Sequence, residues 1–114
     1  MSTARNDAGV IDLSAAQAFI AALAGRDSPV TFQTFPEREG ATCRPMVKHG
    51  SLSNYGDTLR KANEAGAGVF VTINETNLRG RKASDVLKIR AVFADFDGAP
   101  LPETFPLRPH GIIE

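Results

Sequence analysis

The segment Lys88–Phe96 (KIRAVFADF) constrains the fold more than any other part of this 114-residue chain. Its centre is apolar at successive positions, so both faces of the strand that it predicts must be covered. Helices must therefore pack on the sheet, because a large exposed apolar surface would aggregate. The chain is long enough for one domain, and its 42% hydrophobic and 23% charged residues are ordinary for a globular protein. We expect one domain in which helices cover a sheet.

The other elements are expected from hydrophobic spacing and from glycine and proline breakers. Residues 1–10 are polar and aperiodic, and we expect them to be flexible, which leaves residues 11–114 as the single domain. Ser14 and Gln17 form a capping box at the start of the first helix, which Gly25 ends. The remaining expected elements are a strand at Val30–Phe35, an irregular stretch over Glu37–Ser53, a helix at Asn54–Ala65 ended by Gly66, a strand at Val69–Asn74, a helical turn at Ala83–Leu87, a turn at Asp97–Pro100 and the start of a strand at His110–Glu114. This order predicts an α/β (α+β) fold, a mixed sheet with helices packed on it.

Composition argues against several classes of protein. The 13 Lys and Arg residues balance the 13 Asp and Glu residues, so a globally basic nucleic-acid binder is not indicated. The single cysteine, Cys43, excludes an intrachain disulfide and fits a reducing compartment. No apolar run approaches the roughly 18–20 residues of a membrane span, and the N-terminus lacks the apolar core of a signal peptide. We therefore expect a cytoplasmic protein with no membrane partner.

Asp95 and Asp97 are the strongest candidates for chemistry. They lie two residues apart at the end of the expected strand, so their side chains point to the same face. Two carboxylates held close together repel each other, and a hard divalent cation such as Mg²⁺ or Mn²⁺ offsets that repulsion. The alternative is an Asp-Gly turn in which aspartate makes local hydrogen bonds. The apolar strand before the pair favours a metal site with both aspartates as ligands.

A basic segment precedes this strand. Arg79, Arg81 and Lys82 surround Gly80 in the loop that we expect there. Guanidinium and ammonium groups beside a metal site are suited to binding phosphate. The alternative is an ordinary solvated loop. Because carboxylates and phosphate oxygens that share a divalent metal are typical of phosphoryl-transfer sites, we expect the three cations to bind a nucleotide phosphate.

The run from Gly66 to Pro100 resembles the core of the RepB-like primase domains of plasmids, phages and integrated elements, within the archaeo-eukaryotic primase superfamily. The first helix and the first strand expected in the chain, both before this run, are also similar to that family. The resemblance therefore extends from Ile11 to the C-terminus. One departure is Leu78, where we expect relatives to have glycine. The motifs that carry the resemblance are Asn74-Glu75-Thr76, Arg79-Gly80-Arg81-Lys82, Lys88-Ile89-Arg90 and the D-x-D of Asp95 and Asp97.

This resemblance implies an RRM-like catalytic domain of a nucleotidyltransferase that synthesises a primer on a DNA template during plasmid or phage replication. Asp95 and Asp97 would be its catalytic metal ligands, with Mg²⁺ or Mn²⁺ as cofactor, nucleoside triphosphates as substrates, and a helicase domain or replication protein as partner. The superfamily's histidine motif and further acid lie C-terminal to the D-x-D, where only residues 98–114 follow. We therefore expect the N-terminal part of a primase domain, inactive alone. Its interrupted last strand would leave an edge that favours a homodimer.

Two other interpretations stay open. Phosphatases of the haloacid dehalogenase type begin with an apolar strand and D-x-D-G-T, in which Asp95 would be the nucleophile and Asp97 the general acid. Ala99 replaces the threonine, and the chain after Asp97 is too short for the later motifs of that reaction. The second interpretation is a non-catalytic nucleic-acid-binding or protein-binding remnant.

Overall fold

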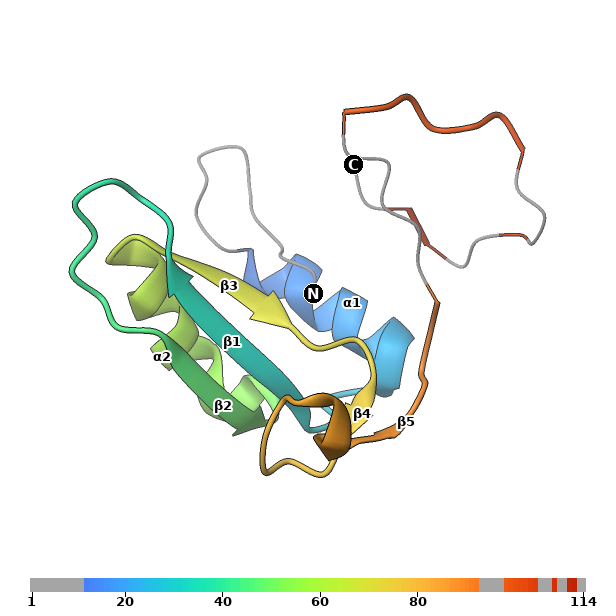
Figure 1. Cartoon of the computed structure of the whole chain (residues 1–114), viewed down its shortest axis with the longest axis horizontal. Helices are drawn as coiled ribbons and strands as arrows, with labels where there is room; N and C mark the ends of the chain where they lie inside the picture. Colours follow the sequence, from blue (N-terminus) through green and yellow to red (C-terminus); the bar gives the residue numbers. More distant parts are fainter. Residues whose placement is uncertain (1–11, 93–97, 105–107, 109–110, 113–114) are drawn as a thin grey trace.

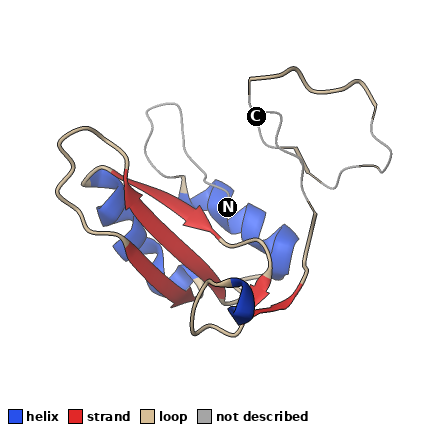
Figure 2. Ribbon diagram, in the orientation of Figure 1, coloured by secondary structure: helices blue, strands red, loops and turns tan. Residues whose placement is uncertain are grey.

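The computed structural model describes residues 12–92, 98–104, 108 and 111–112 (Figure 1). β1 is the central strand of a three-stranded sheet with the order β2-β1-β3, and β4 and β5 form a separate hairpin. Both helices lie on one side of the three-stranded sheet (Figure 2). The combination of helices and strands confirms the α+β class, but every strand pair among the described residues is antiparallel, which differs from the expected mixed sheet. The elements are α1 (Leu13–Ala24), β1 (Val30–Pro36), β2 (Met46–Gly50), α2 (Leu52–Glu64), β3 (Ala67–Val71), β4 (Glu75–Thr76), the 3₁₀ turn η1 (Ala83–Asp85) and β5 (Val86–Lys88).

The hydrophobic core lies between the three-stranded sheet and the two helices. Val30 and Phe32 of β1 pack there with Val69 and Val71 of β3, because alternate residues of a strand share one face. Leu59 of α2 is fully buried against them. The core is completed by Ile20 and Leu52, with Leu13, Ala16, Phe19, Ala24 and Tyr55 packed around it.

Helix α1 is confirmed, but its N-terminal cap differs from the one expected. The Asp12 carboxylate accepts a hydrogen bond from the Ala15 backbone N–H at 3.1 Å, so Asp12 rather than Ser14 caps the helix. Aspartate is favoured here because its oxygen satisfies a free N–H and its charge suits the positive end of the helix dipole. Gly25 ends the helix as expected, at a φ of 103° that other residues rarely adopt.

Strand β2 corrects the expectation that residues 37–53 are irregular. It pairs with β1 from Thr34 opposite Met46 to Val30 opposite Gly50. Its side chains are only partly buried or exposed, as befits an edge strand, and it carries Lys48 among its five residues. Such a segment lacks the run of branched apolar residues that marks a strand in the sequence, and it is ordered by its long-range pairing with β1.

Helix α2 is confirmed with an earlier start than expected. Its cap is Ser51, whose hydroxyl accepts a hydrogen bond from the Asn54 backbone N–H at 3.2 Å, so the helix begins at Leu52 rather than Asn54. The chain leaves the helix through Gly66 at a φ of 103°, which confirms the expected stop. Gly56 is buried inside the helix and faces Leu13 of α1, which a Cβ atom at this position would meet at an ordinary contact distance.

The strand expected at Val69–Asn74 is shifted and divided in the structure. β3 starts two residues earlier and ends at Val71. Residues 72–74 belong to no strand, although the Thr72 N–H still donates to the Thr31 oxygen of β1, and the chain then pairs again as β4. The prediction therefore located the apolar strand but missed the bend that follows it.

The expectation of an interior strand at Lys88–Phe96 is wrong in its described part. Strand β5 covers Val86–Lys88, and residues 89–92 belong to no strand. Ile89 is 71% exposed and Val92 is 85% exposed, so the apolar pattern of this segment does not correspond to burial here. The expected helical turn before it is confirmed by η1.

Two sets of expectations lie outside the described residues. They are the flexible segment expected at residues 1–10 and the part of the expected strand and turn that falls on residues 93–97. Gly98 has a φ of 73°, which fits the expected turn at 97–100. Gly111 and Ile112, within the strand expected at 110–114, have no strand pairing. Neither described helix has the length and apolarity that a membrane crossing requires.

Candidate functional site

The face of the sheet opposite the helices carries polar and aromatic side chains. Thr31, Gln33 and Phe35 of β1 alternate with the core residues and therefore share this face. The strand register places His49 of β2 beside Thr31, and Phe70 of β3 beside Gln33. Both helices lie behind the sheet in Figure 1, so they do not cover this face. We call these five residues the open-face cluster.

Two aromatic rings and one guanidinium group come together on the open face. The ring centroids of Phe35 and Phe70 are 6.0 Å apart, and the rings meet edge to face at 63°. The guanidinium carbon of Arg81 lies 5.8 Å from the centroid of the Phe35 ring. This is a cation–π distance, and it holds a residue of the basic loop against the sheet.

Gln33 of the open-face cluster is buried, and one of its side-chain atoms has no hydrogen-bond partner. The residue is 2% exposed, and its Nε2 donates to the backbone oxygens of Thr34, at 2.8 Å, and Met46, at 3.1 Å. Its Oε1 is buried and has no hydrogen-bond partner. A buried carbonyl oxygen without a donor is costly and rare in proteins. The sheet face therefore contains one buried acceptor that no donor of the described residues satisfies.

A chain of hydrogen bonds connects the sheet to the loop. Thr31 Oγ1 lies 3.0 Å from His49 Nδ1 and 2.7 Å from Thr76 Oγ1. Thr76 Oγ1 also accepts a hydrogen bond from the backbone N–H of Leu78 at 3.1 Å. Both threonines are buried, so these bonds are protected from competition with water. The start of the basic loop is thus tied to the central strand.

The basic loop itself is organised by one carboxylate, that of Asp85. Its Oδ1 accepts a hydrogen bond from Asn77 Nδ2 at 3.1 Å, and its Oδ2 accepts one from the Lys82 backbone N–H at 3.2 Å. A Cβ atom at Gly80 would collide with the same carboxylate. Leu78 has a φ of 60°, a left-handed conformation that glycine adopts more easily.

The three cations predicted for phosphate binding lie together on this loop. Arg79, Arg81 and Lys82 are all exposed, and Arg81 reaches back to the sheet. The predicted metal ligands, Asp95 and Asp97, lie outside the described residues. Among the residues that the structure describes, no group of three or more His, Cys, Asp or Glu side chains could hold a metal ion. The described part therefore contributes cations and aromatic rings to the candidate site.

Reasoning from the sequence missed the contribution of the sheet to this site. A signal was present in the alternation of Val30–Phe35, which places Thr31, Gln33 and Phe35 on one face. The partner of Phe35, Phe70, could not be identified because it depends on the β1–β3 register. The role of Asp85 could not be predicted either, since its hydrogen bonds depend on the fold of the loop.

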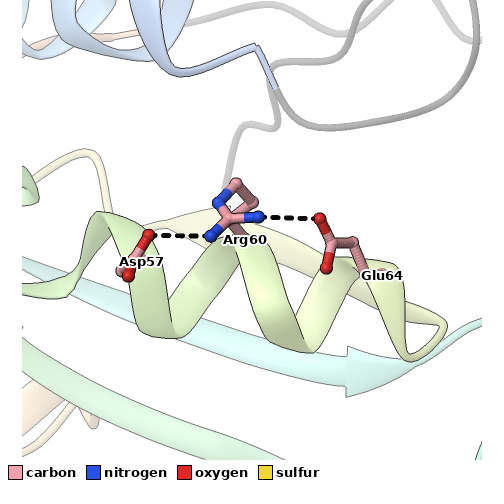
Figure 3. A network of polar contacts seen from close by, with 3 residues as sticks. All are labelled: Asp57, Arg60 and Glu64. Atoms are coloured by element: carbon pink, nitrogen blue, oxygen red, sulfur yellow. Dashed lines mark hydrogen bonds and ion pairs between the residues drawn. The ribbon is translucent and has the colours of Figure 1, made fainter.

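Asp57 and Arg60, whose pKa values are shifted, lie away from the open face, on the exposed side of α2 (Figure 3). Arg60 donates hydrogen bonds to Asp57 and Glu64, each at 2.9 Å. The hydrogen bond and charge of Arg60 lower the pKa of Asp57, and the same partners raise the pKa of Arg60. Asp57 and Glu64 are well exposed, so this network is a solvated helix surface and no part of the open face.

Comparison with known proteins adds no relative to this description. No protein family, no curated protein and no solved structure matches the chain.

Proposed function

We propose that the chain is part of a primase-type nucleotidyltransferase that binds a nucleoside triphosphate together with Mg²⁺ or Mn²⁺. The observation that carries the proposal is the position of Arg81, on an ordered basic loop and against Phe35 of the open face. A cationic loop beside aromatic rings is suited to a ligand with both phosphates and a base. The sequence pattern of the D-x-D and its preceding loop supplies the reaction type.

Arg79, Arg81 and Lys82 would bind the phosphates. Arginine forms paired hydrogen bonds with phosphate oxygens, whereas lysine acts as a point charge. Because Asp85 holds the loop backbone, little order has to be acquired when the ligand binds. The two arginines and the lysine are exposed, so a triphosphate can approach them from solvent.

Asp95 and Asp97 would hold the divalent cation, since carboxylate oxygens are the ligands that Mg²⁺ and Mn²⁺ prefer. A bound cation in such a site would neutralise phosphate charge and stabilise the attacking and leaving oxygens. A DNA template would be the second substrate, and a helicase domain or another replication protein the partner of the complete enzyme. A homodimer through a strand edge is part of the same proposal.

Nucleotide binding by the chain tests this proposal directly. We expect Mg²⁺·ATP to bind, and we expect Arg81→Ala to raise the Kd roughly 10-fold, which corresponds to about 1.4 kcal/mol of binding free energy. Lys61→Ala, on exposed helix α2, is the matched control for loss of one positive charge and should leave the Kd unchanged. Equal Kd values for both variants and the unmodified chain would refute phosphate binding by this loop.

Metal binding needs its own measurement. Mn²⁺ broadens NMR signals of nearby protons, and we expect saturable broadening next to residues 95 and 97. Asp95→Asn combined with Asp97→Asn should abolish it, because neutral amides are poor ligands for this cation. Saturable binding that survives in the double variant would place the metal elsewhere.

A second candidate function, metal-independent binding of single-stranded nucleic acid, is favoured by the Phe35–Phe70 pair. Bases stack on accessible aromatic rings, and a nearby arginine binds the backbone. Both phenylalanines are partly exposed. Fluorescence anisotropy with a labelled oligodeoxythymidine distinguishes the two functions. Binding without metal that Phe70→Ala weakens and the Asp95→Asn, Asp97→Asn double variant preserves would support the non-catalytic function.

A further inference from the structure

The outer edge of β3 is one of the two edges of the three-stranded sheet. The Thr72 backbone N–H donates to the Thr31 oxygen at 2.9 Å, and the β1–β3 register continues from that pair. Hydrogen-bonded residues alternate in an antiparallel ladder, so residues 68, 70 and 72 bond to β1. The backbone groups of Val69 and Val71 therefore point outward. No strand of the described part of the chain pairs with them.

The hairpin that follows β3 has a register that, if it continued, would place a segment of the chain beside this edge. Glu75 of β4 lies opposite Lys88 of β5. In an antiparallel pair one residue number falls as the other rises, so the same register places Ile73 opposite Arg90 and Val71 opposite Val92. Of these positions, Val71 belongs to β3, and its outward backbone groups are the ones with which Val92 would pair. In Figure 1 the chain after β5 instead leaves the hairpin without following β3.

Asn74 occupies the point at which the two paths diverge. Its Oδ1 accepts a hydrogen bond from the Arg90 backbone N–H at 3.2 Å. In an extended hairpin that N–H would donate to the backbone oxygen of Ile73. The Asn74 side chain thus takes the bond that would begin the extended ladder, and it keeps residue 90 next to the edge.

The side chains of this segment fit the register. Val92 is 85% exposed, and pairing would place it beside Val71, which is 6% exposed on the helix-covered face. Directly opposite residues share a face, so Val92 would extend the core. Ala91, opposite Thr72, would lie on the open face. A strand edge this apolar is normally covered, because it otherwise pairs with other chains.

We propose that the outer edge of β3 is the docking site for residues 89–92 of the same chain, which extend the β4–β5 hairpin into a fourth strand with the order β2-β1-β3-β5. The continuity of the hairpin register identifies this occupant. The proposal is independent of the proposed function, since it involves neither nucleotide nor metal.

Amide hydrogen exchange of the unmodified chain tests the docking. We expect the Val71 amide to exchange at least about 10-fold more slowly than the Val47 and His49 amides, which point outward from β2 at the other edge of the same sheet. Val92→Pro removes the N–H that would donate to Val71 and should abolish the slow exchange of the Val71 amide. Ala91→Pro is the matched control, because its N–H points away from β3 in this register. Fast exchange at Val71, or equal effects of the two prolines, would overturn the proposal.

Disulfide trapping checks the register without depending on exchange rates. In a Cys43→Ser background, Thr72→Cys and Ala91→Cys occupy a directly opposed, non-hydrogen-bonded pair, whose Cα separation of roughly 4.5 Å suits a disulfide. Thr72→Cys with Val92→Cys is the control, because the two side chains lie on opposite faces. We expect the first pair to oxidise within monomers and the control pair to stay reduced. Disulfide-linked dimers would show that a second copy occupies the edge, and reduced thiols in both variants would show that residues 89–92 do not dock there.

Discussion

The body of the molecule, residues 12–71, and the arm that follows it, residues 72–92, are ordered in different ways. The body buries its apolar side chains between the sheet and the helices. The arm exposes its own, with Leu87 at 66% and Val92 at 85%, and its order comes from hydrogen bonds around Asp85. Burial is cooperative across many residues, whereas local hydrogen bonds can open one by one. The candidate ligand-binding groups lie where these two kinds of order meet.

The largest expected difference between the two regions is the loss of stability when a leucine in each is truncated to alanine. Leu59 is fully buried in the body, so Leu59→Ala should lower the free energy of unfolding by about 2–5 kcal/mol. Leu87→Ala, the same change in the arm, should alter it by no more than about 0.5 kcal/mol. Urea unfolding followed by circular dichroism measures both. Similar losses for the two variants would mean that the arm belongs to the same cooperative unit as the body.

Glycine substitutions sharpen the description of packing within the body. Gly66 has a φ of 103°, and an added Cβ would lie 2.8 Å from the Ala41 Cβ, so Gly66→Ala should destabilise by about 1–3 kcal/mol. Gly56→Ala should instead stabilise by about 0.5–1 kcal/mol, because alanine favours the helix and its Cβ would meet Leu13 at an ordinary 3.8 Å. The two unfolding midpoints should therefore move in opposite directions. A destabilised Gly56→Ala variant would show that α1 and α2 are packed more tightly than these distances indicate.

The arm should respond locally to the loss of its carboxylate. Asp85→Ala removes the acceptor of the Lys82 N–H, and we expect this amide to exchange roughly 10-fold faster, as for a loss of about 1.4 kcal/mol. The urea midpoint should change little, since no apolar surface is lost. Asp85→Asn keeps an acceptor oxygen and serves as the control, with a smaller change in exchange. A large fall in global stability would contradict the separation of arm and body.

The smallest effect concerns the charged surface of α2. Arg60 lowers the pKa of Asp57, so Arg60→Gln should raise that pKa towards its ordinary value of 3.8. Because the folded-state pKa is depressed, the associated stability is present above the unfolded pKa and is lost as the pH falls through the folded value. NMR titration of the Asp57 carboxyl measures the shift. Lys61→Gln, which removes a weaker influence, should change the pKa less, and an equal change would contradict the dominant role of Arg60.

Sequence patterns located the helices well because their signals are local. The apolar spacing of α1 and the glycine after each helix act within a few residues. The capping residues were harder to predict from the sequence. Asp12 and Ser51 have polar neighbours that are equally able to accept the hydrogen bond of a helix N-terminal N–H. Strand β2 could not be recognised, because it is ordered through its pairing with β1.

The candidate site divides in the same way. Its basic loop could be read from residue order, because three cations in a short polar segment are a local property. The contact of Arg81 with Phe35, the Phe35–Phe70 pair and the buried acceptor of Gln33 all depend on which strands lie side by side. Apolar content alone could not show whether a segment is buried, as the 66% exposure of Leu87 demonstrates, because burial requires an edge or a face to receive it. Composition and spacing therefore specified the helices, the class and the charged loop. The sheet register, which forms over long sequence separations, brought the loop and the aromatic rings together.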